Sequence, residues 1–243
     1  MIEYNIDNKS LGFAFEGAAM ALVISDFLKP LSNKFKEFLN VANKHEYMLY
    51  VGAGWAVAKL PFKRLVLSRL KKDILHALVY DGIGFYEGYF NWQDSIEKQK
   101  IPNYLKTNEY CFYDQGLGRS LWFVFGGNAN KIKECIGKFP KHRRSDLWSG
   151  IGLAATYAGG REDSLVNLKK FSEEYYPNLA QGCTFASKAR CRAENITVHN
   201  RYACKIFCDM TVEQAAKITD DCLSNLDNQN YEDWRLGIKK IFS

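Results

Sequence analysis

The hydrophobic positions of this chain form short apolar segments, each centred on a glycine. Six such segments occur, and their central glycines, called anchor glycines below, stand at positions 17, 52, 82, 116, 150 and 182. Four of the six carry a second glycine two residues later, in the pattern G-x-G. The steps between anchors are 35, 30, 34, 34 and 32 residues, which is self-similarity at a period of about 33 residues.

A second kind of segment lies between the anchors and has the spacing of an amphipathic helix. Residues 62–78 place leucine and isoleucine near i, i+3, i+4 and i+7, and residues 128–139 and 163–176 are patterned similarly. Asn128 and Asp163 stand where an N-cap would begin the last two of these helices.

The two kinds of segment together predict a helical hairpin that recurs along the chain. Each hairpin has an apolar face that it cannot bury alone, so neighbouring hairpins stack. We therefore predict an all-α fold of about six to seven stacked helical hairpins, in a single domain that spans residues 1–243. By analogy of period and pairing, the architecture is tetratricopeptide-like or a related α-solenoid.

The recurrence of G-x-G favours helix packing over nucleotide binding. A phosphate-binding loop needs a strand, then glycines, then a helix N-terminus, and it occurs once per nucleotide. Here the pair occurs four times inside helical patterning, with no β-branched strand before it. Because a glycine inside a helix costs about 1 kcal/mol relative to alanine, we expect each pair to permit close approach of a neighbouring helix.

Composition and charge narrow the class of protein. The chain has 243 residues, of which 47% are hydrophobic and 25% charged, as in an ordinary globular domain. The net charge is +6, and basic residues cluster at 63–72 and 138–144. Both clusters are more typical of solvated helix faces than of a phosphate-binding patch, and no basic stripe interleaves with aromatic residues. We expect no nucleic-acid partner.

The cysteines and the apolar runs predict a cytoplasmic protein. Seven cysteines, an odd number, follow an N-terminus without a secretory signal, which indicates free thiols in a reducing compartment. Apolar runs such as 18–24 and 120–125 are shorter than a bilayer requires, so we expect no membrane span.

The anchor segments resemble those of a known bacterial family. The motifs that carry the resemblance are FAFEGAAMAL, YVGAGWA, DGIGFYEGYF, YDQGLGRSLWFV, DLWSGIGLAATYAGG, LAQGCTFASKAR and YEDWRLGIKK. They resemble the UnbL-type family of unknown function, which is often encoded beside enediyne polyketide synthases, and the similarity runs from about Gly12 to residue 240. Relatives usually carry a further N-terminal segment. The resemblance implies a role in secondary metabolism, on a polyene-like polyketide, and supplies no catalytic residues.

Polar residues just before the anchor glycines are the main candidates for chemistry. They are Glu16, Asp81, Gln115, Ser149 and Gln181. If the anchor helices stack in parallel, these positions form a column along one face, which Asp114 and Arg119 extend. Desolvated carboxylates in such a groove can act as general acid and base.

Glu87 is a further candidate, because it stands between small and aromatic residues where burial would favour the protonated carboxyl. The candidate catalytic residues are therefore Glu16, Asp81, Glu87, Asp114 and Arg119. The candidate substrate-binding residues are Trp55, Tyr86, Trp122, Trp148, Gln115, Gln181 and Lys188.

Structural alternatives stand beside each of these assignments. Polar residues at one phase of a repeat also hydrogen-bond a neighbouring hairpin, and Asp81 or Asp114 can pair with Arg119 across the array. The aromatic residues fit a packed core better than a ligand site. Cys204 and Cys208 lie one helical turn apart, but nothing in the sequence completes a zinc site, so we expect neither a metal nor a cofactor.

Two classes of function remain. One is a cofactor-independent acid–base enzyme that acts on a small hydrophobic polyene or aromatic intermediate. The other is a non-catalytic helical-repeat adaptor or carrier that binds a synthase or another pathway protein. A closed pocket with converging carboxylates favours the first, and an open groove with exposed apolar surface favours the second.

Overall fold

The computed structural model describes residues 6–29, 31–226 and 230–243, and these residues form thirteen α-helices and no strand. The helices that carry the anchor glycines are α1 (Leu11–Leu28), α3 (Glu46–Lys59), α5 (Ala77–Phe90), α6 (Tyr110–Val124), α8 (Lys141–Ala158) and α10 (Tyr176–Arg192). The others are α2 (Lys34–Val41), α4 (Lys63–Arg69), α7 (Ala129–Gly137), α9 (Glu162–Ser172), α11 (Val198–Cys208), α12 (Val212–Ser224) and α13 (Tyr231–Ile241). The predicted all-α class is confirmed.

The glycine pairs bring the long helices together in chain order. In α6, a Cβ added to Gly116 would lie 1.7 Å from the carbonyl oxygen of Asp81 in α5. A Cβ added to Gly118 would lie 2.2 Å from the carbonyl oxygen of Leu147 in α8. The first glycine of a pair therefore faces the preceding long helix and the second faces the following one, and α3, α5 and α8 repeat the arrangement. Gly17 is an exception, since it is exposed and its Cβ would have no neighbour within 4 Å.

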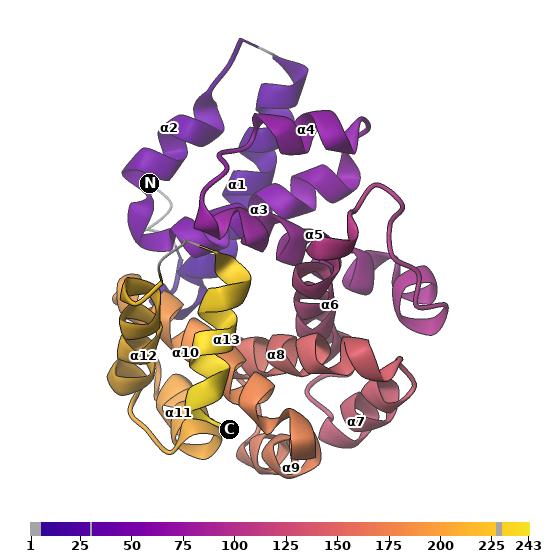
Figure 1. Ribbon diagram of the computed structural model, residues 1–243. Coiled ribbons are helices and arrows are strands. Elements are labelled where there is room, and N and C mark those ends of the chain that lie inside the picture. Colours follow the sequence, from indigo (N-terminus) through magenta and orange to yellow (C-terminus); the bar gives the residue numbers. More distant parts are fainter. Residues whose placement is uncertain (1–5, 30, 227–229) are drawn as a thin grey trace.

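The series of long helices bends round until its last member meets the start of the chain. In Figure 1, α1 and α3 lie at the top, α5 and α6 at the right, α8 below them and α10 at the left. Arg190 of α10 donates a hydrogen bond to the Lys9 carbonyl (3.0 Å), and Asn195 donates one to the Asn8 carbonyl (3.2 Å). Side chains on the inner faces of α1, α5, α6, α8 and α10 can consequently meet.

The predicted amphipathic helix over 62–78 is wrong. α4 ends at Arg69, and a 3-10 turn that leads into α5 begins at Ile74. The break arises because the Asp73 side chain accepts a hydrogen bond from the Leu75 amide (3.1 Å) and so caps the new turn.

Of the two predicted N-caps, one is confirmed. Asn128 caps α7 by accepting a hydrogen bond from the Lys131 amide (3.1 Å). Asp163 instead lies in the first turn of α9 and forms an ion pair with Arg161 (3.0 Å). The segments between the long helices differ in length and type, from α4 to a π turn over Gln93–Glu97, so the hairpin repeat stays a prediction.

The apolar run 18–24 is only part of a longer apolar helical segment, so judging by this run underestimated the length of that segment. By length and composition alone, Asn8–Leu28 is long and apolar enough to cross a membrane, and no other described stretch is. In the fold this segment packs against α3 and carries the buried Glu16. One such helix does not establish a membrane span.

Candidate functional site

The predicted polar column exists as a chain of buried side chains. Arg119 of α6 forms ion pairs with Glu16 of α1 (3.2 Å) and with Asp81 of α5. The Gln115 amide nitrogen donates to the other carboxylate oxygen of Asp81 (2.8 Å). All four residues are at least 95% buried. We call Glu16, Asp81, Gln115 and Arg119 the central cluster.

Two further members of the column connect the central cluster to α8 and α10. The Ser149 hydroxyl lies 2.6 Å from the amide oxygen of Gln181 and 3.1 Å from that of Gln115, and can donate to either. All three residues are fully buried. Five of the six long helices therefore contribute to one polar chain.

Within the central cluster, the pKa of Glu16 is shifted far from its usual value. Burial raises the pKa of Glu16 to about 7, and the charge and hydrogen bond of Arg119 only partly offset that effect. At neutral pH this carboxyl therefore exists in both the protonated and the ionised form, which is the property required of a general acid or base.

A small pocket adjoins the central cluster. Its cavity volume is about 40 Å³, which accommodates a few water molecules. Asp81 and Arg119 line its polar part, and Lys188 also borders it. Its largest apolar contributors are Tyr47, Met48, Tyr157, Phe185, Tyr231 and Trp234. A ligand larger than a few water molecules must displace some of these side chains.

Two residues that line this pocket each carry a hydrogen-bond donor without a partner. Among the described residues, nothing accepts a hydrogen bond from the Nε of Arg119 or from the hydroxyl of Tyr157, and both atoms are buried. Burial raises the pKa of Tyr157 to about 12, so its hydroxyl stays protonated near neutrality. Because buried polar groups are nearly always hydrogen-bonded, these two donors suit an oxygen atom of a ligand or of water.

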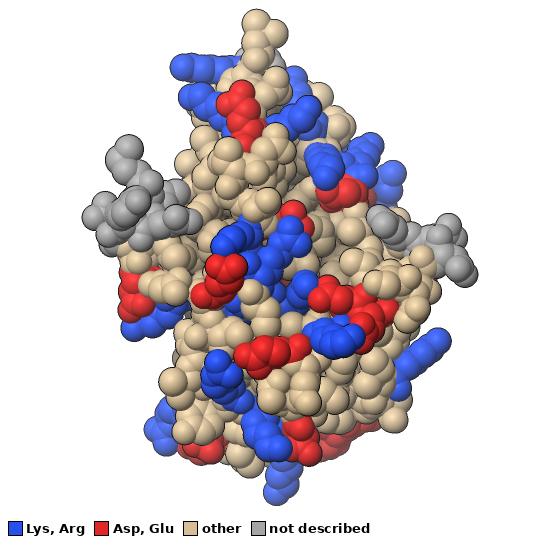
Figure 2. Space-filling view, turned by 90° about the vertical axis from the view of Figure 1, so that its left-hand side faces the viewer, with Lys and Arg blue, Asp and Glu red and all other residues tan. Residues whose placement is uncertain are grey.

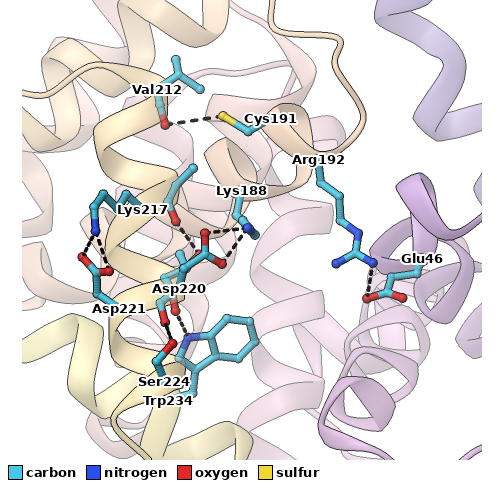
Figure 3. Close-up of polar contacts among 12 residues, drawn as sticks. Glu46, Lys188, Cys191, Arg192, Val212, Lys217, Asp220, Asp221, Ser224 and Trp234 are labelled. Atoms are coloured by element: carbon cyan, nitrogen blue, oxygen red, sulfur yellow. Dashed lines mark hydrogen bonds and ion pairs between the residues drawn. The ribbon is translucent and has the colours of Figure 1, made fainter.

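Ion pairs join α10 to neighbouring helices near the pocket, one of them through the lining residue Lys188. Figure 2 shows Lys and Arg side chains gathered in the middle of one face of the molecule, with Asp and Glu side chains around them. Lys188 of α10 forms an ion pair with Asp220 of α12 (2.6 Å), and Arg192 forms one with Glu46 of α3 (3.1 Å) (Figure 3). Lys188 is thus the predicted substrate-binding residue that the structure places at the pocket.

Asp114 does not join Arg119, although the two are neighbours on α6. Asp114 accepts two hydrogen bonds from Arg143 of α8, from Nε (2.8 Å) and Nη2 (2.5 Å). The remaining nitrogen of Arg143 donates to the Gln99 carbonyl (2.8 Å). Burial raises the pKa of Asp114, although Arg143 counteracts this. We call Asp114 and Arg143 the α6–α8 pair. Sequence reasoning assigned Arg143 to a solvated basic cluster and so missed it.

Glu87 lies apart from both groups. Its side chain is half-buried and accepts a hydrogen bond from Asn91 (2.7 Å) near the end of α5. It does not line the pocket. The full burial expected for this carboxyl is therefore not found, because the last turn of α5 faces outward.

The aromatic residues that were predicted to bind substrate lie in the core or near the surface, and none of them lines the pocket. Trp122 donates its indole hydrogen to the Gly159 carbonyl (3.1 Å), and Trp148 is buried. Trp55 stacks on Phe85, and Tyr86 packs against Phe90. The aromatic residues that do line it include Tyr231 and Trp234, whose only sequence signal is the C-terminal motif YEDWRLGIKK.

The described residues contain one group suited to a metal ion, and it is separate from the pocket. Cys183 joins Cys204 and Cys208, which the sequence had left without a third partner.

Comparison with known proteins gives one match. The model of a family described as "Protein of unknown function (DUF1702)" matches residues 3–242, nearly the whole chain. No curated protein and no solved structure matches.

Proposed function

We propose, from the premise that this chain belongs to the DUF1702 family of proteins of unknown function, that it performs acid–base chemistry on a small hydrophobic molecule. The observation that carries the proposal is the position of the central cluster: a carboxyl with a pKa of about 7 is paired with an arginine that lines an aromatic pocket. Such a combination of a perturbed carboxyl and a concave apolar site is typical of active sites.

Each member of the site has a chemical role in this proposal. Arg119 Nε and the Tyr157 hydroxyl donate hydrogen bonds to an oxygen of the substrate and stabilise negative charge that develops there. Asp81 borders the pocket and accepts or delivers the proton. Glu16 does not border the pocket; it shares the guanidinium with Asp81 and so sets the charge of the cluster near neutral pH.

The walls of the pocket support a flat, unsaturated or aromatic substrate, because rings such as Tyr47, Phe185 and Trp234 offer stacking surfaces. The resemblance of the motifs to UnbL-type proteins suggests a polyene-like intermediate of secondary metabolism. The seven free cysteines are compatible with a cytoplasmic location.

The test is a deletion of the gene in a producing strain, with the accumulated intermediates profiled by mass spectrometry. Complementation with the natural gene should clear the precursor, whereas Asp81→Asn and Arg119→Met should leave it accumulated. Glu87→Gln is the matched control, since its carboxylate lies away from the pocket, and it should complement fully. Normal clearance by Asp81→Asn and Arg119→Met would contradict catalysis at this site.

A non-catalytic adaptor is the second candidate, and exposed apolar side chains favour it. Leu28, Leu31, Val41 and Phe62 are 71%, 100%, 80% and 73% exposed, and all four fall within residues 28–62. Exposed apolar side chains that form a contiguous patch mark sites of protein association. Under this alternative, Leu31→Ser with Phe62→Ser abolishes complementation while the pocket variants retain it, which separates the two candidates.

A further inference from the structure

Three cysteine side chains meet between α10 and α11, away from the proposed active site. Cys204 and Cys208 lie one turn apart on α11, and Cys183 faces them from α10. The three sulfur atoms lie within 4.8 Å of one another. Cys183 and Cys204 are fully buried and Cys208 is 5% exposed. Nothing in the proposed acid–base chemistry uses these thiols.

The surroundings of the cluster offer the sulfur atoms only weak partners. Cys204 lies 3.4 Å from the Thr211 carbonyl oxygen and Cys208 lies 3.7 Å from the Ala180 carbonyl oxygen. The Ser187 hydroxyl lies 3.7 Å from the Cys204 sulfur. Among the described residues, no histidine, aspartate or glutamate joins the group. The site therefore presents three buried sulfur ligands, with only neutral carbonyl and hydroxyl groups beside them.

We propose that Cys183, Cys204 and Cys208 bind one Cu(I) ion. Sulfur ligands select soft cations, chiefly Cu(I), Zn(II) and iron–sulfur clusters. Zinc takes four ligands in a structural site, and an iron–sulfur cluster requires about four cysteines. Three sulfurs without a nitrogen or carboxylate ligand fit Cu(I), which is stable with three sulfur ligands.

The number of thiols that ionise sets the charge of the occupied site. A Cu(I) ion held by two thiolates and one thiol leaves a net charge of −1 in the buried site, and the two displaced protons pass to solvent. The same ion with three thiolates would leave −2, which burial opposes more strongly. The metal would also tie α11 to α10, and it would stabilise the fold because the site does not exist in the unfolded chain.

The experiment is an anaerobic titration of the reduced protein with Cu(I) in competition with a chromophoric Cu(I) chelator. The protein has four other cysteines, so the decisive variant is Cys111→Ser, Cys135→Ser, Cys191→Ser and Cys222→Ser combined. We expect this variant to retain one tightly bound Cu(I) per chain. Its X-ray absorption spectrum should show a first shell of sulfur only, with about three ligands.

The complementary variant replaces Cys183, Cys204 and Cys208 by serine and keeps the other four cysteines. It should bind Cu(I) at least tenfold more weakly. If it does not fold, the first variant still decides the matter. Loss of Cu(I) binding in that variant, a first shell with nitrogen or oxygen, or uptake of Zn(II) in preference to Cu(I) would each overturn the proposal.

Discussion

Two buried groups of charges lie side by side on α6, and they differ in how completely their hydrogen bonds are satisfied. In the α6–α8 pair, all three nitrogens of the Arg143 guanidinium have acceptors, from Asp114 and from the Gln99 carbonyl. In the central cluster, Arg119 serves two carboxylates and its Nε has no acceptor among the described residues.

Burial and charge therefore do not by themselves identify the residues that take part in function. A closed ion pair with every donor satisfied has nothing left to offer a ligand, so the α6–α8 pair is best understood as a tie between two helices. The central cluster has an excess of carboxylate over arginine, a free donor and an adjoining pocket. Four substitutions, at Gly116, Asp114, Glu16 and Glu87, test this distinction.

Gly116→Ala should be the most damaging change, because it separates the helices on which the central cluster is built. The new methyl group would lie 1.7 Å from the Asp81 carbonyl oxygen, so α5 and α6 must move apart and Asp81 must leave Arg119. We expect the free energy of unfolding, measured by urea denaturation, to fall by about 4 kcal/mol.

Gly17→Ala is the matched control for this prediction. Gly17 lies within α1 with no neighbour near its Cα hydrogen, so alanine should stabilise the protein by up to about 1 kcal/mol. Similar effects of the two substitutions would show that the anchor glycines do not act through close helix packing.

Asp114→Asn should destabilise the fold without altering the chemistry of the pocket. It leaves the positive charge of Arg143 buried without a counterion, which typically costs about 3 kcal/mol. Replacing both partners, by Asp114→Leu with Arg143→Met, should recover most of that loss because no charge then remains buried. Chemical denaturation of the single and double variants measures the coupling between the two residues. A double variant as unstable as the single one would mean that the pair does more than join α6 to α8.

The sequence could predict contacts between equivalent positions of the repeat, but not contacts that depend on how two helices cross. The polar residues before the anchor glycines could be predicted to face one another, because packing at a repeated phase brings equivalent positions together. The partner of Asp114 could not, since Arg143 lies in the first turn of α8, well before the anchor glycine Gly150, and its direction depends on how α6 and α8 cross. The third cysteine of the metal cluster was hidden for the same reason: Cys183 and Cys204 are far apart in sequence and meet only after α10 and α11 have packed.

Glu16→Gln should change the pH dependence of stability. In the natural protein the pKa of Glu16 rises from 4.5 in the unfolded chain to about 7 in the fold. Between these values the folded state holds a proton that the unfolded state has lost, so the free energy of unfolding falls as pH increases and levels off above about 7. The contribution of this one group is at most about 3 kcal/mol.

The glutamine variant should lose this decline, which urea denaturation at a series of pH values between 4 and 8 would measure. Asp114→Asn provides the comparison, because it leaves Glu16 and Arg119 in place and should keep the part of the decline between pH 4.5 and 7 that belongs to Glu16. An unchanged profile in Glu16→Gln would mean that the pKa of this carboxyl is the same in the folded and the unfolded chain, and would remove it from the proposed chemistry.

Glu87→Gln should have the smallest effect on the free energy of unfolding. It tests whether a carboxylate outside the central cluster and the α6–α8 pair takes part in the chemistry. Its carboxylate is half-buried, bonded to Asn91 and remote from both arginines that define the two groups. A glutamine retains the acceptor for Asn91, so we expect a change in the free energy of unfolding below about 0.5 kcal/mol and full clearance of the pathway precursor. A strain that expresses normally but accumulates the precursor would place a reactive carboxylate at the end of α5. The central cluster would then be a second closed structural network, of the same kind as the α6–α8 pair.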